Sequence, residues 1–215
     1  MSLPLPKIAE ALKEAKKKAK PRKFKQSVEL IIKLRDVDLK NPANRLNTVV
    51  FLPHAPKKKV KIAVFAAGDM ALKAKEAGAD LVLSRDDIER LAGNKKEIKK
   101  LAKEYDFFLA QADLMPLIGR YLGRFLGPRG KMPAPVPPRA NIEEIIKRYR
   151  SAVRLRVRDQ PQVACRIGTE DQSEEELAEN AQAIINQILQ KYKPYNLDKV
   201  YVKLTMGKPV SVKVK

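Results

Sequence analysis

The chain has 215 residues, a length that suits one or two domains, each large enough to bury its own core. Its 45 Lys and Arg against 25 Asp and Glu give a formal net charge of +20, and such an excess usually has a polyanionic partner. One cysteine, Cys165, excludes an internal disulfide framework, and together with the single His54 it argues against an all-protein zinc site. No apolar run reaches the roughly 18 residues of a membrane-spanning helix, and no cleavable signal peptide is recognisable. These features predict a cytoplasmic protein without cofactor, metal or membrane partner.

The first part of the chain predicts one helix and two strands. Apolar residues at helical spacing predict a helix over 7–20, which Pro21 ends; its stripe is Ile8, Ala11, Leu12 and Ala15. A strand follows in which four apolar residues share one face: Phe24, Val28, Leu30 and Ile32. We expect this strand to pair antiparallel with a second strand over 47–52.

The middle of the chain alternates buried strands with helices. Strands are expected within "KIAVFAAG", "ADLVL" and "YDFFLAQ", because continuous apolar runs are typical of strands buried on both faces. Helices are expected over 69–77, 86–91, 95–104 and 113–122, and Asn141 caps one more. This alternation predicts a parallel sheet with flanking helices. The stretch "KMPAPVPPRAN" is the only one that resembles a linker.

The last part returns to alternating strands. The segments "VRLRVR" and "VACRIG" precede a helix that Ser173 opens with Glu176 in a capping box, and two closing strands lie over 200–204 and 210–214. We therefore predict an α+β split domain, an antiparallel sheet with helices built from both termini over 1–61 plus 151–215. An α/β Rossmann-like three-layer domain over 62–150 is inserted into it. The insert carries a net charge of +5 and the remainder +15, so the electrostatic footprint belongs mainly to the split domain.

Signatures of nucleotide-using enzymes are missing. A dinucleotide-binding turn requires G-x-G-x-x-G after the first buried strand, where the chain has only Gly68 and Asp69. The segment "GPRGK" lacks the spacing of a phosphate-binding loop, and Met132 stands where the Mg²⁺-binding hydroxyl should be. The sequence therefore predicts a protein that is not an enzyme and has no catalytic residues, with an architectural DNA-binding protein as the alternative to an RNA-binding one.

Several basic segments leave two interpretations open. No acidic residue occurs between Asp113 and Glu143, a run that contains Arg120, Arg124, Arg129, Lys131 and Arg139. The arginines either contact nucleic acid or are solvated, and Tyr121 and Phe125 within the run either stack on bases or belong to the core. The same choice applies to Lys57–Lys59 and to the lysine-rich first helix.

The hairpin between the closing strands has unusual residues at its tip. Thr205, Met206 and Gly207 stand where turn residues alone would suffice, and near the start Phe24 lies between Lys23 and Lys25. A hydroxyl can bond a ribose, glycine allows close approach of a backbone, and methionine packs against irregular surfaces. The alternatives are a plain hairpin and a contact surface for RNA.

Three segments together, "KFKQSVEL", "LGRFLGPRGKMP" and "VYVKLTMGKPV", resemble the L1 family of large-subunit ribosomal proteins, archaeal type, over nearly the whole chain. The resemblance implies two hinged domains, the first built from both termini. It also implies binding of large-subunit ribosomal RNA at the mobile stalk and help in releasing deacylated tRNA from the exit site. Repression of translation of the protein's own mRNA is implied as well, and we expect a monomer when the protein is free.

The same resemblance implies a set of RNA-binding residues. Positions that match the family's contacts are Phe24, Ser27, Glu29, Gly168, Thr205, Met206 and Gly207. The cations Lys23, Lys25, Lys199 and Lys203 complete the expected set. At Lys33 and Lys199 the chain departs from bacterial members, which often carry other polar residues there.

Overall fold

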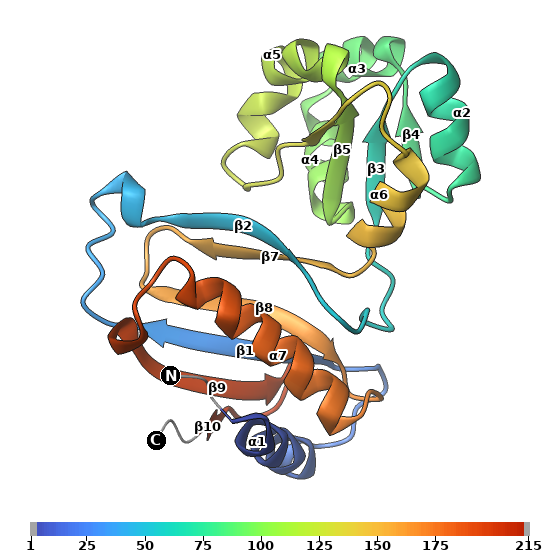
Figure 1. Cartoon of the computed structure of the whole chain (residues 1–215). Helices are drawn as coiled ribbons and strands as arrows, with labels where there is room; N and C mark the ends of the chain where they lie inside the picture. The colour runs from blue at the N-terminus through green and yellow to red at the C-terminus, as the bar shows by residue number, and fades with distance from the viewer. Residues whose placement is uncertain (1–3, 213–215) are drawn as a thin grey trace. The chain divides into compact units, whose positions relative to one another are not determined.

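The computed structural model describes residues 4–212, and its contacts divide the chain into two compact units. The first unit contains the residues up to Lys58 together with those from Ser151 onward, and the second is Lys59–Arg150. Figure 1 shows blue and red segments, from the two ends of the chain, side by side in the first unit. Within the described range no helix is long and apolar enough to cross a membrane.

The first unit is built on a four-stranded antiparallel sheet in the order β10-β9-β1-β8. Its strands are β1 (Ser27–Leu34), β8 (Gln162–Thr169), β9 (Leu197–Leu204) and β10 (Val210–Val212). Alternate residues of β1 are fully buried because one face of the sheet is covered by α1 (Leu5–Lys18) and α7 (Glu174–Leu189) (Figure 1). The apolar stripe predicted for the first helix is buried in this core, as expected.

Two expectations for this unit are wrong. Strand β2 (Leu46–Phe51) pairs with β7 (Ala152–Val157) in a separate two-stranded sheet, not with β1, because both edges of β1 are already occupied by β8 and β9. Phe24 does not share the buried face of β1: the strand begins only at Ser27, and Phe24 is 51% exposed. Lys213 and Val214, predicted to end the last strand, lie outside the described residues.

The second unit holds a parallel sheet in the order β4-β3-β5-β6. Its strands are β3 (Ile62–Phe65), β4 (Leu81–Leu83), β5 (Phe107–Gln111) and β6 (Ala134–Val136). Strand β6 falls in the stretch predicted to be a linker, and that prediction is wrong. Pro135 is compatible with a strand here because β6 lies at the sheet edge and pairs only with β5.

Helices cover both faces of this sheet. On one face, α3 (Arg85–Ala92), α4 (Lys95–Glu104) and α5 (Met115–Leu126) pack against Phe65 and Phe108. On the other, α2 (Gly68–Glu76) contacts α6 (Ile142–Tyr149), and Tyr149 meets Phe107 edge to face with ring centroids 5.5 Å apart. Short 3-10 turns complete the chain at Pro42–Asn44, Ala112–Leu114 and Pro194–Asn196. The chain thus combines antiparallel and parallel sheets with helices, a mixed α/β architecture as predicted.

Candidate nucleic-acid interface

The beginning of β1 brings three distant segments of the chain together. Ser27 lies opposite Thr169 of β8, and the neighbouring Val28 lies opposite Gly168 on one side and Leu204 of β9 on the other. We call the resulting surface the strand-end surface and define it as residues 23–29, 168–172 and 203–207. It contains ten of the eleven predicted RNA-binding residues.

Thr205 is bonded to Ser27 through both its backbone and its side chain. The Thr205 amide donates to the Ser27 carbonyl at 3.0 Å, and the Thr205 hydroxyl donates to the same carbonyl at 3.2 Å. That hydroxyl also accepts from the Ser27 amide at 3.2 Å. One acceptor position of the hydroxyl remains for a partner. Thr205 therefore fixes the hairpin tip against β1 in addition to any contact that it makes with a ligand.

Gln26, which is 1% exposed, joins all three segments of the strand-end surface. Its side-chain carbonyl accepts from the Met206 amide at 3.1 Å, and its side-chain amide donates to the Lys20 carbonyl at 3.3 Å. Its backbone amide donates to the Glu170 carboxylate at 3.0 Å. A buried polar side chain with all these partners holds their relative positions.

The two large apolar side chains on this surface are exposed to solvent. Met206 at the hairpin tip is 58% exposed and Phe24 is 51% exposed. Gln26 lies two residues after Phe24 and bonds the amide of Met206, so the two side chains belong to segments that are bonded to each other. Exposed apolar groups on a hydrogen-bonded, basic surface are typical of stacking and packing against unpaired bases.

The two glycines of the surface differ in their surroundings. Gly168 is buried, and a Cβ there would lie 2.4 Å from both the Gln172 and the Leu177 side chains, so any side chain at this position would have to displace them. A Cβ on Gly207 would meet Leu204 and Ala19 at ordinary contact distances of 3.4–3.5 Å. Gly168 supports the surface from inside, while Gly207 lies at the partly exposed tip.

Glu29 and Lys203 form a cross-strand pair below the tip. They lie opposite each other in register, with the Lys203 ammonium 3.9 Å from the Glu29 carboxylate and 3.1 Å from the Thr205 carbonyl, to which it donates. Both side chains are less than one-third exposed. Their charges are thus largely directed at each other and at the tip backbone.

Asp171 organises two further lysines. Its carboxylate accepts from the Thr169 hydroxyl at 2.6 Å and lies 3.2 Å from the Lys25 ammonium. Lys57 donates to the Asp171 carbonyl at 2.9 Å. The hydrogen bond from Thr169, followed by that from Lys25, lowers the pKa of Asp171 from 3.8 to about 2. Asp171 therefore remains ionised and keeps both lysines at this surface.

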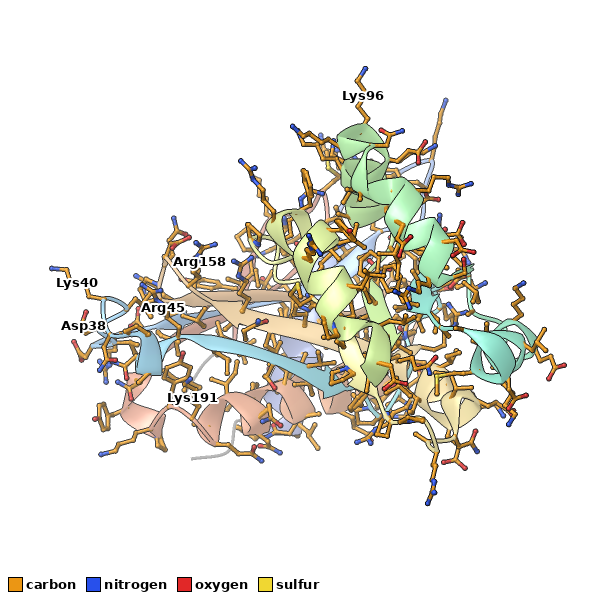
Figure 2. The ribbon with its side chains drawn as sticks, turned by 90° about the horizontal axis from the view of Figure 1, so that it is seen from above. Asp38, Lys40, Arg45, Lys96, Arg158 and Lys191 are labelled. Carbon is orange, nitrogen blue, oxygen red and sulfur yellow. The ribbon has the colours of Figure 1, made fainter. Side chains whose placement is uncertain are left out.

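Lys199 is not part of the strand-end surface. It lies opposite Lys33 near the other end of β1, six residues before Thr205, a separation of about 20 Å along an extended strand. The register of β9 separates Lys199 from the tip residues, and its expected contact with RNA stays a prediction. Figure 2 shows that this other end of the unit carries Lys40, Arg45, Arg158 and Lys191.

The acid-free basic run between Asp113 and Glu143 contains α5, the turn that ends it, β6 and the segment that leads into α6. Tyr121 and Phe125 pack against the core of the second unit, which favours the structural interpretation for both. Lys131 donates to the Tyr105 carbonyl at 2.6 Å and Arg129 to the Lys99 carbonyl at 3.3 Å. Since these two cations serve the fold, nucleic-acid contact is left to the exposed Arg120, Arg124 and Arg139.

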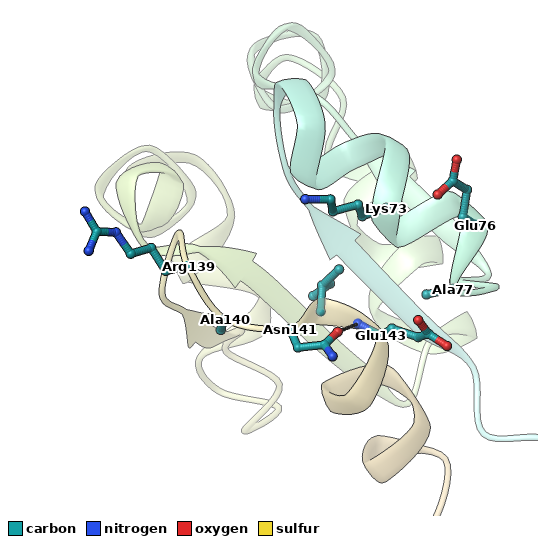
Figure 3. A pocket seen from close by; sticks show the side chains of 8 residues that line it. Lys73, Glu76, Ala77, Arg139, Ala140, Asn141 and Glu143 are labelled. Atoms are coloured by element: carbon teal, nitrogen blue, oxygen red, sulfur yellow. Dashed lines mark hydrogen bonds between the residues drawn. The ribbon is translucent and has the colours of Figure 1, made fainter.

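The second unit also has a hollow of about 540 Å³ between α2 and the segment that leads into α6 (Figure 3). Carboxylates and cations both line it, including Lys73, Glu76, Arg139 and Glu143. Lys73 is paired with Asp69 at 2.6 Å and Glu143 with Lys147 at 2.7 Å, and Figure 3 shows the Arg139 side chain pointing away from α2. This balanced lining offers little attraction for a polyanion, in contrast to the strand-end surface.

Gln26, Thr169 and Asp171 were missed by sequence reasoning. A signal for Gln26 was present, because it shares the inward parity of Val28, Leu30 and Ile32, and a polar residue at an inward position needs buried partners. No comparable signal marks Asp171, whose contacts depend on the pairing of β1 with β8.

Comparisons with known proteins show which family this chain resembles. The model of the Ribosomal protein L1p/L10e family matches residues 12–208. "Large ribosomal subunit protein uL1" of Thermofilum pendens is 59% identical over 207 residues, covering 95% of this chain and 92% of that protein. The proteins of the same name from Hyperthermus butylicus (53% over 210 residues, 97% and 96% covered) and Methanothermobacter thermautotrophicus (49% over 207 residues, 95% and 98% covered) are also similar.

Proposed function

The chain belongs to the ribosomal protein L1p/L10e family, archaeal type, and on that premise we propose that its first unit binds large-subunit ribosomal RNA through the strand-end surface. Membership of a family of ribosomal proteins agrees with the prediction that the protein is not an enzyme. The names of the relatives support a place in the large ribosomal subunit, and hence in the cytoplasm.

The observation that carries the proposal is that two exposed apolar side chains, Phe24 and Met206, lie on segments that the buried Gln26 side chain connects. Gln26 fixes the segments of Phe24 and Met206, so both side chains are presented without the cost of ordering a loose loop. Folded RNA offers unstacked bases, riboses with 2′-hydroxyls, and phosphates. Phe24 and Met206 suit bases and riboses, while Lys23 and Lys25 suit phosphates.

The remaining predicted residues take supporting or direct roles in this proposal. Ser27 holds Thr205 in place, Thr205 presents the one free acceptor position of its hydroxyl at the tip, and Gly207 allows RNA to approach the backbone there. Glu29, Lys203 and Gly168 hold the tip in place from within the sheet. Lys199 lies too far along β9 to join the same contact.

We extend the proposal to the finer roles that family membership suggests. The two units would act as domains joined by a hinge, with the second moving toward tRNA at the exit site to assist release of deacylated tRNA. A folded segment of the protein's own mRNA that resembles the ribosomal RNA site would occupy the same strand-end surface, so that free protein represses its own translation. A reporter carrying the leader of that mRNA tests the second role.

A binding competition tests the main proposal. The full chain is titrated with a labelled large-subunit RNA fragment at fixed salt, and unlabelled RNA or duplex DNA of equal length is added as competitor. We expect RNA to compete at concentrations at least tenfold below those of duplex DNA, because charge attraction alone does not distinguish 2′-hydroxyls. Equal competition by the two would overturn the proposal and favour an architectural DNA-binding protein, which the net charge alone would also fit.

A further inference from the structure

Four cations near the end of α1 have no partner for their side chains. Between Lys16 and Lys25 the chain carries several basic residues, of which Lys17, Lys20, Arg22 and Lys23 are exposed, and their side chains make no hydrogen bond or ion pair with any residue in 4–212. Three of them, Lys17, Lys20 and Arg22, lie outside the strand-end surface as defined above. We call these three the α1 flank.

Nearby carboxylates pair with three lysines that lie before, within and after the segment of the α1 flank. Glu174 lies 3.0 Å from the Lys16 ammonium, Asp171 lies 3.2 Å from that of Lys25, and Glu14 pairs with Lys18 one turn along the helix. The protein thus neutralises the cations around the flank and leaves the flank itself positive. Unpaired charges of one sign within a short segment repel one another and destabilise the folded protein, unless a partner of opposite charge binds there.

The helix C-terminus explains only part of this charge. Lysines in the last turn of α1 interact favourably with the helix dipole, which accounts for Lys17. Lys20 and Arg22 follow the end of the helix at Lys18, and the chain there is irregular up to the start of β1. The dipole effect fades within one turn, so these two cations need another explanation.

The α1 flank is joined to the tip of the closing hairpin. The Lys20 carbonyl accepts from the side chain of Gln26, whose carbonyl in turn accepts from the Met206 amide. A Cβ on Gly207 would lie 3.5 Å from that of Ala19, so Gly207 lies beside the Ala19 side chain. The end of α1 therefore lies next to the hairpin tip that carries Met206.

We propose that Lys17, Lys20 and Arg22 form a phosphate-binding flank that contacts the sugar–phosphate backbone of the RNA bound at the strand-end surface. This inference rests on the proposed function. Met206 and Phe24 contact bases and riboses, and the flank holds phosphates of the same molecule beside them. The flank supplies affinity and orientation rather than sequence preference. Lys23 connects the two surfaces.

The test compares two triple variants of the full chain with the same change in formal charge. Lys17→Gln/Lys20→Gln/Arg22→Gln removes the flank, and Lys96→Gln/Lys100→Gln/Lys103→Gln removes three exposed cations of α4; Figure 2 shows Lys96 extending into solvent. Affinity for a large-subunit RNA fragment is measured over a series of salt concentrations. Phosphate-ethylation interference on the same fragment identifies the phosphates that each protein needs.

We expect the flank variant to reduce the slope of log affinity against log salt by about 2, since each phosphate contact contributes about 0.7–0.9. Ethylation of a small group of phosphates should no longer weaken RNA binding by this variant. The α4 variant should keep the salt slope and the ethylation-interference pattern of the wild type. The charge-preserving Lys17→Arg/Lys20→Arg/Arg22→Lys variant should retain most of the slope and the full pattern. An unchanged thermal melting curve in all three variants excludes unfolding as the cause.

The outcomes separate the inference from the function on which it rests. The wild type could prefer RNA to duplex DNA while the flank variant behaves like the α4 variant. That result would overturn phosphate binding by the α1 flank and leave the proposed function standing. If the charge-preserving variant fails as badly as the glutamine variant while still folded, simple phosphate binding is overturned. If the wild type shows no preference for RNA, both proposals fail together.

Discussion

At the residue scale, the structure gives several predicted contact residues a second task inside the protein. Thr205 looks from the sequence like a free hydroxyl at a hairpin tip, but its hydroxyl both donates to and accepts from the backbone of Ser27. Gly168 looks like a site of close RNA approach, yet the space beside it is filled by Gln172 and Leu177. The residue types were identifiable from the sequence; their partners depend on strand register, which the sequence did not specify.

Replacing Thr205 tests this internal task. Thr205→Val keeps the shape of the side chain but leaves the Ser27 amide without the hydroxyl, and we expect a loss of about 1 kcal/mol in the free energy of unfolding. Thr205→Ser keeps the hydroxyl and should lose less than half of that. Urea denaturation of the full chain measures the free energy of unfolding of both variants. Hydrogen exchange of the β1 amides then locates the change in the first unit. Equal stability of the valine variant and the wild type would contradict the bonding described for Thr205.

Asp171 makes a prediction about pH. Its pKa is lowered in the folded protein to about 2, so its stabilising contribution is complete above the unfolded value near 3.8 and is lost as pH falls toward 2. A carboxyl NMR titration should therefore show Asp171 with a midpoint near 2. Thr169→Val should raise that midpoint more than Lys25→Gln does, because the Thr169 hydroxyl is the larger cause. A wild-type midpoint near 3.8 would show that the Thr169–Asp171 bond does not persist in solution.

At the scale of helices and strands, periodicity and capping identified elements better than they identified pairings. The helix expected over 95–104 is α4 with the same bounds, since Asn94 caps it and an apolar face follows. Strand β6 was missed because its prolines are typical of linkers, and only its edge position makes them acceptable. The pairing of β2 with β7 joins residues about a hundred positions apart, which local patterns do not encode.

The capping box of α7 provides a prediction at this scale. The Ser173 hydroxyl accepts from the Glu176 amide at 3.1 Å, and the Glu176 carboxylate accepts from the Ser173 amide at 3.3 Å. Ser173→Ala should lower the free energy of unfolding by about 1 kcal/mol. Ser211→Ala, on the exposed face of β10, is the matched control and should change it by less than about 0.5 kcal/mol.

Hydrogen exchange of peptides from the start of α7 locates the effect of this change. Faster exchange should be confined to the first turns of α7 in the Ser173→Ala protein. An equal loss of unfolding free energy in Ser173→Ala and Ser211→Ala would mean that the Ser173 cap does not specifically stabilise α7.

At the scale of the whole molecule, the distribution of charge agrees with the position of the candidate interface. The second unit, Lys59–Arg150, contains 19 Lys and Arg against 12 Asp and Glu, whereas the rest of the chain contains 26 against 13. The first unit therefore carries a net charge of +13 out of +20. The sequence identified this charge imbalance correctly, and the structure shows where the unpaired cations lie in the first unit.

The two exposed apolar side chains make the sharpest comparison between the units. Phe24 and Met206 in the first unit are 51% and 58% exposed, and the second unit offers Leu72 at 60% and Met132 at 38% as a matched pair. Removing a base-stacking or base-packing side chain costs about 1–3 kcal/mol of binding per base. Only the first pair should affect RNA binding.

A footprint of the protein on full-length large-subunit ribosomal RNA, probed with hydroxyl radicals, tests the central claim most directly. The wild type and the Leu72→Ala/Met132→Ala protein should protect the same single compact stretch. The Phe24→Ala/Met206→Ala protein, equally folded by its melting curve, should need at least tenfold more protein to protect it. Protection scattered over the RNA, or an identical footprint and affinity in both double variants, would contradict RNA recognition by the strand-end surface.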